Sequence, residues 1–297
     1  MKLNESLSTY FEMFTEPYLF SHDNDPVYPV LKGVHNLRKL NPQQRAWHTF
    51  LYLVWYHLGS AEKAFSRNPL PSLMCDIEIW PTGTERRGVR GAPGIAKIQK
   101  LLQTVVSSNW LERCKSVYEN KKFTREARWM FLYKEVQRLP FCGTWAAYKW
   151  CDLCKNVLGA DITAVDIGVG GQGKNAGPIP GMVQLTGESW VRCASDVGLQ
   201  IELMEYYIEQ GIPFHGLEEL ETALCDFNSL THGHYYVGHD IDAQQEHLKG
   251  LPQVYWEARA KLIPKNFLGE LNGWTGVRKE LRRKYIDDGV IFQGGKA

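Results

Sequence analysis

The residues best suited to chemistry gather around a short turn between two predicted helices. Leu139 and Pro140 end the first helix, Gly143 ends the turn, and Thr144 begins the second helix. A turn this short lets two helices pack closely and leaves the first backbone amides of the second helix unpaired. Those amides and the helix dipole form a favourable site for a phosphate group. Leu139, Gly143 and Thr144 are therefore candidate phosphate-contacting residues, with an ordinary helical hairpin as the alternative.

A glycine-rich segment, residues 168–175, almost matches the phosphate-binding loop of nucleotide hydrolases. Asn175, however, stands where Ser or Thr would hold Mg²⁺. Such a loop also leads straight into a helix, which Pro178 and Pro180 argue against. The sequence shows no alternation of strands and helices that would build the required sheet. We therefore expect residues 168–181 to form a loop, whose amides can still cradle a phosphate.

The cysteines do not form a disulfide or metal pattern. There are seven, an odd number with irregular spacing, which argues against a disulfide framework. Cys151 and Cys154 lie three residues apart within a predicted helix, and the histidines that would complete a zinc site are far along the chain. Two packed thiols on one helix face are the favoured interpretation. The sequence therefore predicts no metal and no cofactor.

Helical periodicity accounts for most of the chain, and Pro, Gly and capping residues mark the helix ends. The predicted helices are residues 42–66, 95–107, 110–118, 125–138, 144–158, 187–210 with a break at Gly198, 217–227, 244–262 and 277–287. Residues 162–165 are the best candidate for a strand, and the Pro- and Gly-rich residues 69–94 are expected to form a loop. The predicted fold class is mainly α.

The composition is that of an ordinary globular protein with little net charge. Hydrophobic residues make up 44% and charged residues 23%, which excludes a disordered chain. Because the formal net charge is only +1, any contact with a nucleic acid would have to come from a local basic patch or from backbone amides. No apolar run reaches membrane-spanning length, and residues 1–25 lack the pattern of a secretory signal. We expect a cytoplasmic protein.

The turn and the segment after it resemble the DNA-binding hairpin of the helix-hairpin-helix base-excision glycosylases. Their pattern is Leu-Pro-Gly-hydrophobic-Gly, a helix, and then Val-Asp, and Val165-Asp166 follows here at nearly the same spacing. The resemblance implies a helix-hairpin-helix DNA-glycosylase-like helical fold, with the hairpin at residues 125–158 and Asp166 as a catalytic residue. Phe141 replaces the first hairpin glycine. Trp145 stands where bifunctional members carry a lysine nucleophile, so no lyase step through that lysine is expected.

A narrower resemblance extends over roughly residues 40–245. The matching motifs are Arg45-Ala46-Trp47, Arg86-Arg87-Gly88-x-Arg90, Leu139-Pro140-Phe141-x-Gly143-x-Trp145-x-x-Tyr148-Lys149-x-x-Asp152-Leu153, Glu221-x-x-Leu224-Cys225 and Gly233-His234-Tyr235-Tyr236-x-Gly238-x-Asp240. They look like the glycosylase-derived amino acid:DNA transferases of DNA-hypermodifying phages, first labelled α-glutamyl/putrescinyl thymine pyrophosphorylases. The resemblance implies that an amino acid of the glycine or glutamate class attacks 5-pyrophosphoryloxymethyl-uracil in double-stranded DNA through its amine, and that pyrophosphate leaves.

This implied reaction assigns roles on the DNA side. A glycosylase-type fold would reach the target by flipping the nucleotide into a pocket, where Trp145 or Tyr148 would stack on it or wedge beside it. The leaving pyrophosphate needs positive charge, and guanidinium groups suit phosphate oxygens. Arg86, Arg87 and Arg90 are the candidates for this contact, and each has a solvated loop as its alternative.

The remaining candidates would handle the pyrophosphate and the proton. Lys149 is a reserve cation for the pyrophosphate. The attacking amine must be neutral, so a carboxylate or an imidazole must accept its proton. Asp166, Asp152 and His234 are the candidates, although Asp152 could simply face water and Asp166 could cap the next segment.

Two other functions remain open at this point. One is a monofunctional helix-hairpin-helix DNA glycosylase in which Asp166 helps to expel a damaged base. The other is a non-catalytic DNA-binding module. For the transferase, the implied partners are double-stranded DNA carrying activated 5-hydroxymethyl-uracil, free glycine or glutamate, and other phage modification enzymes, with no membrane. The implied location is the cytoplasm of the infected bacterial host. Residues 1–297 are expected to form a single helical, glycosylase-like unit, with two lobes as the alternative and a loose tail at residues 289–297.

Overall fold

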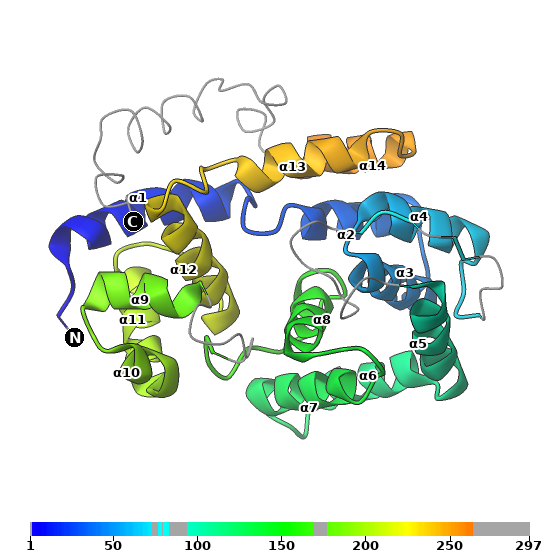
Figure 1. The fold of residues 1–297 in the computed structure, drawn as a ribbon, viewed down its shortest axis with the longest axis horizontal. Coiled ribbons are helices and arrows are strands. Elements are labelled where there is room, and N and C mark those ends of the chain that lie inside the picture. The colour runs from blue at the N-terminus through cyan, green and yellow to red at the C-terminus, as the bar shows by residue number, and fades with distance from the viewer. Residues whose placement is uncertain (1, 73–76, 79, 83–93, 169–176, 264–297) are drawn as a thin grey trace. The chain divides into compact units, whose positions relative to one another are not determined.

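The protein is built from α-helices throughout the part that the structure describes. The computed structural model describes residues 2–72, 77–78, 80–82, 94–168 and 177–263. These residues form fourteen α-helices and no β-strand (Figure 1), so the prediction of a mainly α fold is confirmed. Within the same residues, no helix combines the length and the apolar character needed to cross a bilayer.

The described residues divide into two compact units. The first unit comprises residues 2–26, 164–246 and 260–263. It contains α1 (Glu5–Phe20), α9 (Pro178–Thr186), α10 (Trp190–Ser195), α11 (Val197–Glu209), α12 (Leu217–Thr231) and most of α13 (His239–Leu248). The core of this unit is aromatic, because the Phe11 ring of α1 lies 4.7 Å from the Tyr207 ring and 5.1 Å from the Phe227 ring, between centroids.

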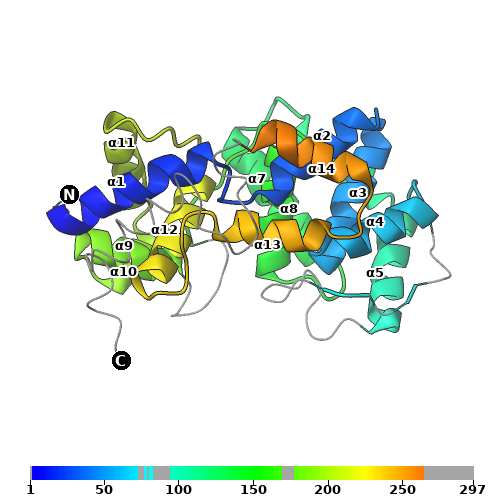
Figure 2. The same ribbon diagram turned by 90° about the horizontal axis from the view of Figure 1, so that it is seen from above.

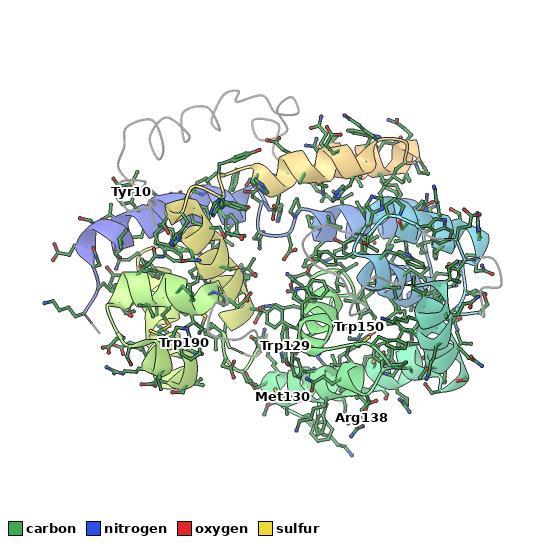
Figure 3. All side chains as sticks on the ribbon, viewed as in Figure 1. Tyr10, Trp129, Met130, Arg138, Trp150 and Trp190 are labelled. Carbon is green, nitrogen blue, oxygen red and sulfur yellow. The ribbon has the colours of Figure 1, made fainter. Side chains whose placement is uncertain are left out.

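The second unit comprises Val27–Thr163 and His247–Arg259. Its helices are α2 (Val27–Leu37), α3 (Pro42–Trp55), α4 (Leu58–Arg67), α5 (Ile95–Ser107), α6 (Trp110–Tyr118), α7 (Arg125–Gln137), α8 (Thr144–Asn156) and most of α14 (Gln253–Leu262). Trp110, Trp150 and Phe50 are fully buried and pack with ring centroids 5.3 to 5.7 Å apart. Figure 3 labels Trp150, which belongs to α8, and Arg138, which directly follows α7 and has an exposed side chain.

Several predicted helices form as expected. The helices over residues 95–107 and 110–118 are confirmed, and α7 and α8 end one and two residues before the predicted positions. Thr124 caps α7, because its hydroxyl oxygen accepts a hydrogen bond from the Ala127 amide at 3.2 Å.

Three long predicted helices are each divided into two. The helix predicted over residues 42–66 breaks at Tyr56, which adopts a left-handed conformation with φ 47°. In residues 187–210, the break lies at Asp196 rather than at Gly198, and Asp196 caps α11 through the Leu199 amide. In residues 244–262, α13 and α14 are separate helices. The side chains of His57 and Asp196 accept hydrogen bonds from the first free amides of α4 and α11, which replaces the bonds that a continuous helix would have supplied.

The prediction that residues 168–181 form a loop throughout is wrong, because α9 begins at Pro178. Proline is tolerated in the first turn of a helix, where its missing N–H has no intrahelical partner to lose. The strand predicted at residues 162–165 is also wrong. Two helices near the start of the chain, α1 and α2, were not anticipated. The helix predicted at residues 277–287 and the tail at residues 289–297 lie outside the described residues.

Candidate functional site

The hairpin formed by α7 and α8 carries the predicted phosphate-contacting residues. The two helices lie side by side in both ribbon views (Figure 1, Figure 2). Leu139 is buried and Gly143 and Thr144 are half-buried. Gly143 is the residue that caps α8, and no side chain caps the helix start. The first amides of α8 therefore lack a side-chain cap, which suits contact with an anion.

Phe141 occupies the hairpin in a conformation that favours glycine. Its φ is +67°, in the left-handed region that costs a residue with a Cβ about 1–2 kcal/mol. The Lys97 ammonium nitrogen of α5 lies 5.6 Å from the centroid of the Phe141 ring. The turn thus keeps a glycine-like backbone although its residue is aromatic, and a cation stands beside it.

The two aromatic candidates on α8 have different surroundings. Trp145 is half-buried, and its ring meets the Tyr56 ring at 4.9 Å between centroids in an edge-to-face arrangement. Tyr148 is only 3% exposed and packs edge-to-face on Trp129, at 5.6 Å. Trp145 is therefore the more accessible of the two for stacking on a base, while Tyr148 belongs to the helix core in this structure.

Lys149 and Asp152 form a buried ion pair on α8. The Lys149 ammonium nitrogen lies 3.3 Å from Oδ2 of Asp152, and both side chains are almost fully buried. Tyr28 of α2 donates a hydrogen bond to the same oxygen at 3.0 Å, and Asn156 donates one to Oδ1 at 2.8 Å. A buried carboxylate is tolerated when it receives several donors of this kind. The alternative in which Asp152 faces water is wrong, because the side chain is enclosed.

Asp166 lies in a short irregular segment of the first unit, after the hairpin in the sequence. It is half-buried, and its Oδ1 accepts a hydrogen bond from the Gly168 amide at 2.7 Å. Ala164 and Ile167, on either side of Val165-Asp166, are buried. The segment thus presents Val165 and Asp166 between two anchored residues.

The sequence motif that ends at Asp240 surrounds a buried aspartate from the start of the chain. Asp23 accepts hydrogen bonds from the Tyr235 hydroxyl at 2.8 Å and from the Gly238, Asp240 and Ile241 amides. Burial and the nearby Asp240 carboxylate raise the pKa of Asp23 to about 7, against the effect of these hydrogen bonds. His234, from the same motif, is exposed. The motif therefore fixes the start of α13 through Asp23.

The structure brings some of the predicted site residues together. Lys149 and Asp152 are in contact, and they share α8 with Thr144, Trp145 and Tyr148. Asp166 and His234 belong to the first unit, on separate segments. Arg86, Arg87 and Arg90 lie outside the described residues, as does most of the glycine-rich segment.

Sequence reasoning missed four polar side chains that hold these candidates. They are Tyr28 beside Asp152, Asp23 inside the Gly233–Asp240 motif, and Gln200 and Glu218, which bind the segment of Asp166. Each is buried and comes from a helix or turn distant in sequence. The sequence could show only that a polar residue lies within an apolar helical pattern, which does not reveal the residue that it binds.

The two cysteines of the Cys-x-x-Cys pair are buried on α8. Burial raises the pKa of both the Cys151 and the Cys154 thiols well above the ordinary value. Among the described residues, no group of three or more His, Cys, Asp or Glu side chains is arranged to hold a metal ion.

Comparison with known proteins identifies the family. The model of the amino acid:DNA transferase family matches residues 76–236, which include the hairpin, Asp166 and His234. No curated protein matches the chain. The match covers more than half of the chain, so the protein belongs to the amino acid:DNA transferase family and is a transferase that acts on DNA with an amino acid.

Proposed function

We propose that the protein joins a free amino acid, of the glycine or glutamate class, to 5-pyrophosphoryloxymethyl-uracil in double-stranded DNA. The observation that carries the proposal is the family match over residues 76–236, which spans both the α7–α8 hairpin and Asp166. The reaction would take place in the cytoplasm of a phage-infected bacterium, alongside the enzymes that prepare the activated base.

The proposed step is a substitution at the 5-methylene carbon of the base. A bond forms between this carbon and the amine nitrogen of the amino acid, and the bond between the carbon and the pyrophosphate oxygen breaks. Pyrophosphate leaves with the electron pair, and the nitrogen loses one proton. A general base must accept that proton, since only a neutral amine has the lone pair for attack.

Asp166 is the proposed base. It is half-buried, and one of its oxygens is oriented by the Gly168 amide. Asp152 is the weaker candidate, because it is enclosed and bonded to Tyr28, Lys149 and Asn156. His234 is exposed and remains a second candidate for the proton.

DNA would be held through the start of α8. The amides there have no side-chain cap, so a backbone phosphate can accept their hydrogen bonds. Lys97 adds a positive charge beside Phe141 at the hairpin. The base would be flipped out of the duplex to expose its methylene group, and Trp145 is the proposed stacking residue. Arg86, Arg87 and Arg90 remain the proposed contacts to pyrophosphate, with Lys149 in reserve.

The test is mass spectrometry of nucleosides from duplex DNA that bears 5-pyrophosphoryloxymethyl-uracil, incubated with the protein and a pool of amino acids. We expect a nucleoside heavier by one amino acid and release of pyrophosphate. The Asp166→Asn variant should lose about 100-fold or more of this activity, because general-base catalysis contributes about 10²–10⁴-fold, while its affinity for DNA should hardly change.

The matched control is Asp161→Asn, five residues earlier. Asp161 is 49% exposed and pairs with Lys121, Arg125 and Arg128, so its loss should leave the modification rate nearly unchanged. If abasic sites form without an added amino acid, the protein is a glycosylase instead. If the base is unchanged and binding to DNA is only salt-sensitive, the protein is a DNA-binding module instead.

A further inference from the structure

The segment that carries Asp166 is held at both of its ends by buried polar side chains. On one side, the Ala164 amide donates a hydrogen bond to Oε2 of Glu218 at 3.0 Å. On the other side, the Ile167 amide donates one to Oε1 of Gln200 at 3.1 Å. These two amides directly flank Val165 and Asp166. The backbone on either side of the candidate base is therefore fixed by side chains from other parts of the first unit.

The two holding residues come from neighbouring helices and are themselves enclosed. Glu218 lies in the first turn of α12 and is 2% exposed, and Gln200 lies on α11 and is 0% exposed. Gln200 is oriented by its own amide nitrogen, which donates to the Cys193 carbonyl at 2.9 Å. The start of α12 also suits a carboxylate, because the helix dipole is positive there.

A buried carboxylate is an energetically costly way to make this contact. Burying an ionisable side chain carries a large desolvation penalty, and an apolar contact would anchor a simple connection at lower cost. A polar anchor instead fixes the direction of the backbone, since a hydrogen bond constrains both distance and angle. Such constraint is needed when a side chain has to reach a reacting atom.

We propose that Glu218 and Gln200 are positioning residues for the transfer reaction, acting through the backbone of residues 164–167 to aim the Asp166 carboxylate. This inference rests on the proposed function of Asp166. Neither side chain is proposed to contact the DNA or the amino acid. Loss of either hydrogen bond would let the segment shift, and a displacement of about 1 Å can cost on the order of 100-fold in rate.

The first test compares Glu218→Ala with Glu218→Gln, and Gln200→Ala with Gln184→Ala. Glu218→Ala and Gln200→Ala should lower kcat about 10- to 100-fold, with KM for the amino acid and affinity for DNA nearly unchanged. Glu218→Gln keeps an oxygen that accepts the Ala164 amide, so it should restore most of the activity. Gln184 of α9 donates a hydrogen bond to Asn228 of α12 rather than holding the Asp166 segment, and Gln184→Ala serves as the control for lost packing.

A double-mutant comparison asks whether Glu218 acts through Asp166. In the Asp166→Asn background, Glu218→Ala should cause little further loss of kcat, because the group that it positions is already disabled. Independent, multiplying losses would overturn the inference, as would a Glu218→Ala enzyme with the wild-type kcat.

Hydrogen exchange separates failure of this inference from failure of the proposed function. Amides of residues 164–168 should exchange faster in Glu218→Ala and Gln200→Ala than in the wild type or in Gln184→Ala. If the wild type does not modify the activated DNA, the proposed function fails, and so does a positioning role in it, whatever the exchange shows. If the wild type is active and exchange of the segment is unchanged in both variants, only the positioning role is overturned.

Discussion

At the scale of single residues, the hairpin keeps a left-handed backbone conformation at position 141 although the residue there is not glycine. Phe141 has the φ of +67° that glycine adopts without cost, although a Cβ makes this conformation unfavourable. The contact of its ring with the Lys97 ammonium group offsets only part of this cost. Phe141 therefore places an aromatic side chain at the proposed DNA contact, at the cost of an unfavourable backbone conformation.

This interpretation predicts an unusual order of stabilities at position 141. Phe141→Gly and Phe141→Ala both remove the ring, but only glycine relieves the left-handed strain. The glycine variant should therefore be more stable than the alanine variant by about 1 kcal/mol. Urea unfolding of the two variants measures this difference.

The control is Ala260→Gly, at an exposed position of α14. There glycine should be the less stable residue, by up to about 1 kcal/mol, because a helix interior favours alanine. An alanine variant at position 141 as stable as the glycine variant would show that the turn relaxes and that Phe141 is not strained.

At the scale of elements, the close approach of α9 to α12 explains how a helix forms in a segment that the sequence marks as a loop. Gly177 and Gly181 face α12, and a Cβ on Gly181 would lie 2.3 Å from the Leu224 carbonyl oxygen. A Cβ on Gly177 would lie 2.3 Å from the Cys225 sulfur. The glycines thus allow two helix backbones to touch, and this packing offsets the low helix propensity of the segment.

Gly181→Ala is expected to be strongly destabilising for this reason. The new methyl group would meet backbone atoms of Leu224, which cannot rotate away, so α9 and α12 must separate. We expect a loss of about 2–3 kcal/mol in the free energy of unfolding, measured by urea denaturation.

Gly198→Ala provides the comparison, since its Cβ would approach only the Asp196 side chain, at 3.2 Å. The effect there should stay within about 1 kcal/mol of the wild type. Equal stabilities for the two variants would mean that α9 and α12 are not in direct backbone contact.

At the scale of the whole molecule, polar groups buried in the second unit should couple its stability to pH. His35 of α2 is fully buried 5.2 Å from the His48 ring, between centroids, and neither of its ring nitrogens has a hydrogen-bond partner among the described residues. Burial, together with His48, Arg45 and Arg38, lowers the pKa of His35 well below its ordinary value. The folded protein therefore keeps this imidazole neutral.

The sign of the pH effect follows from this lowered pKa. Below about pH 6.5, the unfolded chain binds a proton at His35 that the folded protein does not, so stability falls as the pH decreases. His35→Leu removes this proton uptake and two unpaired buried nitrogens. The variant should gain about 1–3 kcal/mol at pH 7.5 and a further ~1.4 kcal/mol at pH 5.5, one pH unit below the unfolded pKa.

Urea unfolding at the two pH values tests this expectation, with exposed His232→Gln as the control that should change little at either pH. A gain from His35→Leu that is the same at pH 5.5 and pH 7.5 would show that His35 is protonated to the same extent in the folded and unfolded protein.

The sequence by itself determined the helical class, the two helices of the central hairpin and the family. Local periodicity identifies α5, α6, α7 and α8, and Thr124 and Pro140 mark the two ends of α7. The hairpin motif, together with the motifs at residues 45–47, 86–90, 221–225 and 233–240, also led to the family that the comparison identifies. These features are encoded in neighbouring residues, so a linear pattern suffices to find them.

Only the tertiary structure decided which buried polar residues form hydrogen bonds with one another. Glu218 lies 54 residues from the amide that it binds, and Asp23 lies more than 200 residues from Tyr235, Gly238 and Ile241. No periodicity links such positions, since the contact exists only once separate helices have packed. The same holds for α9, whose glycines argue against a helix locally and permit one only against α12. Packing overrides propensity where two backbones meet, and it supplies the partners that make buried charges tolerable.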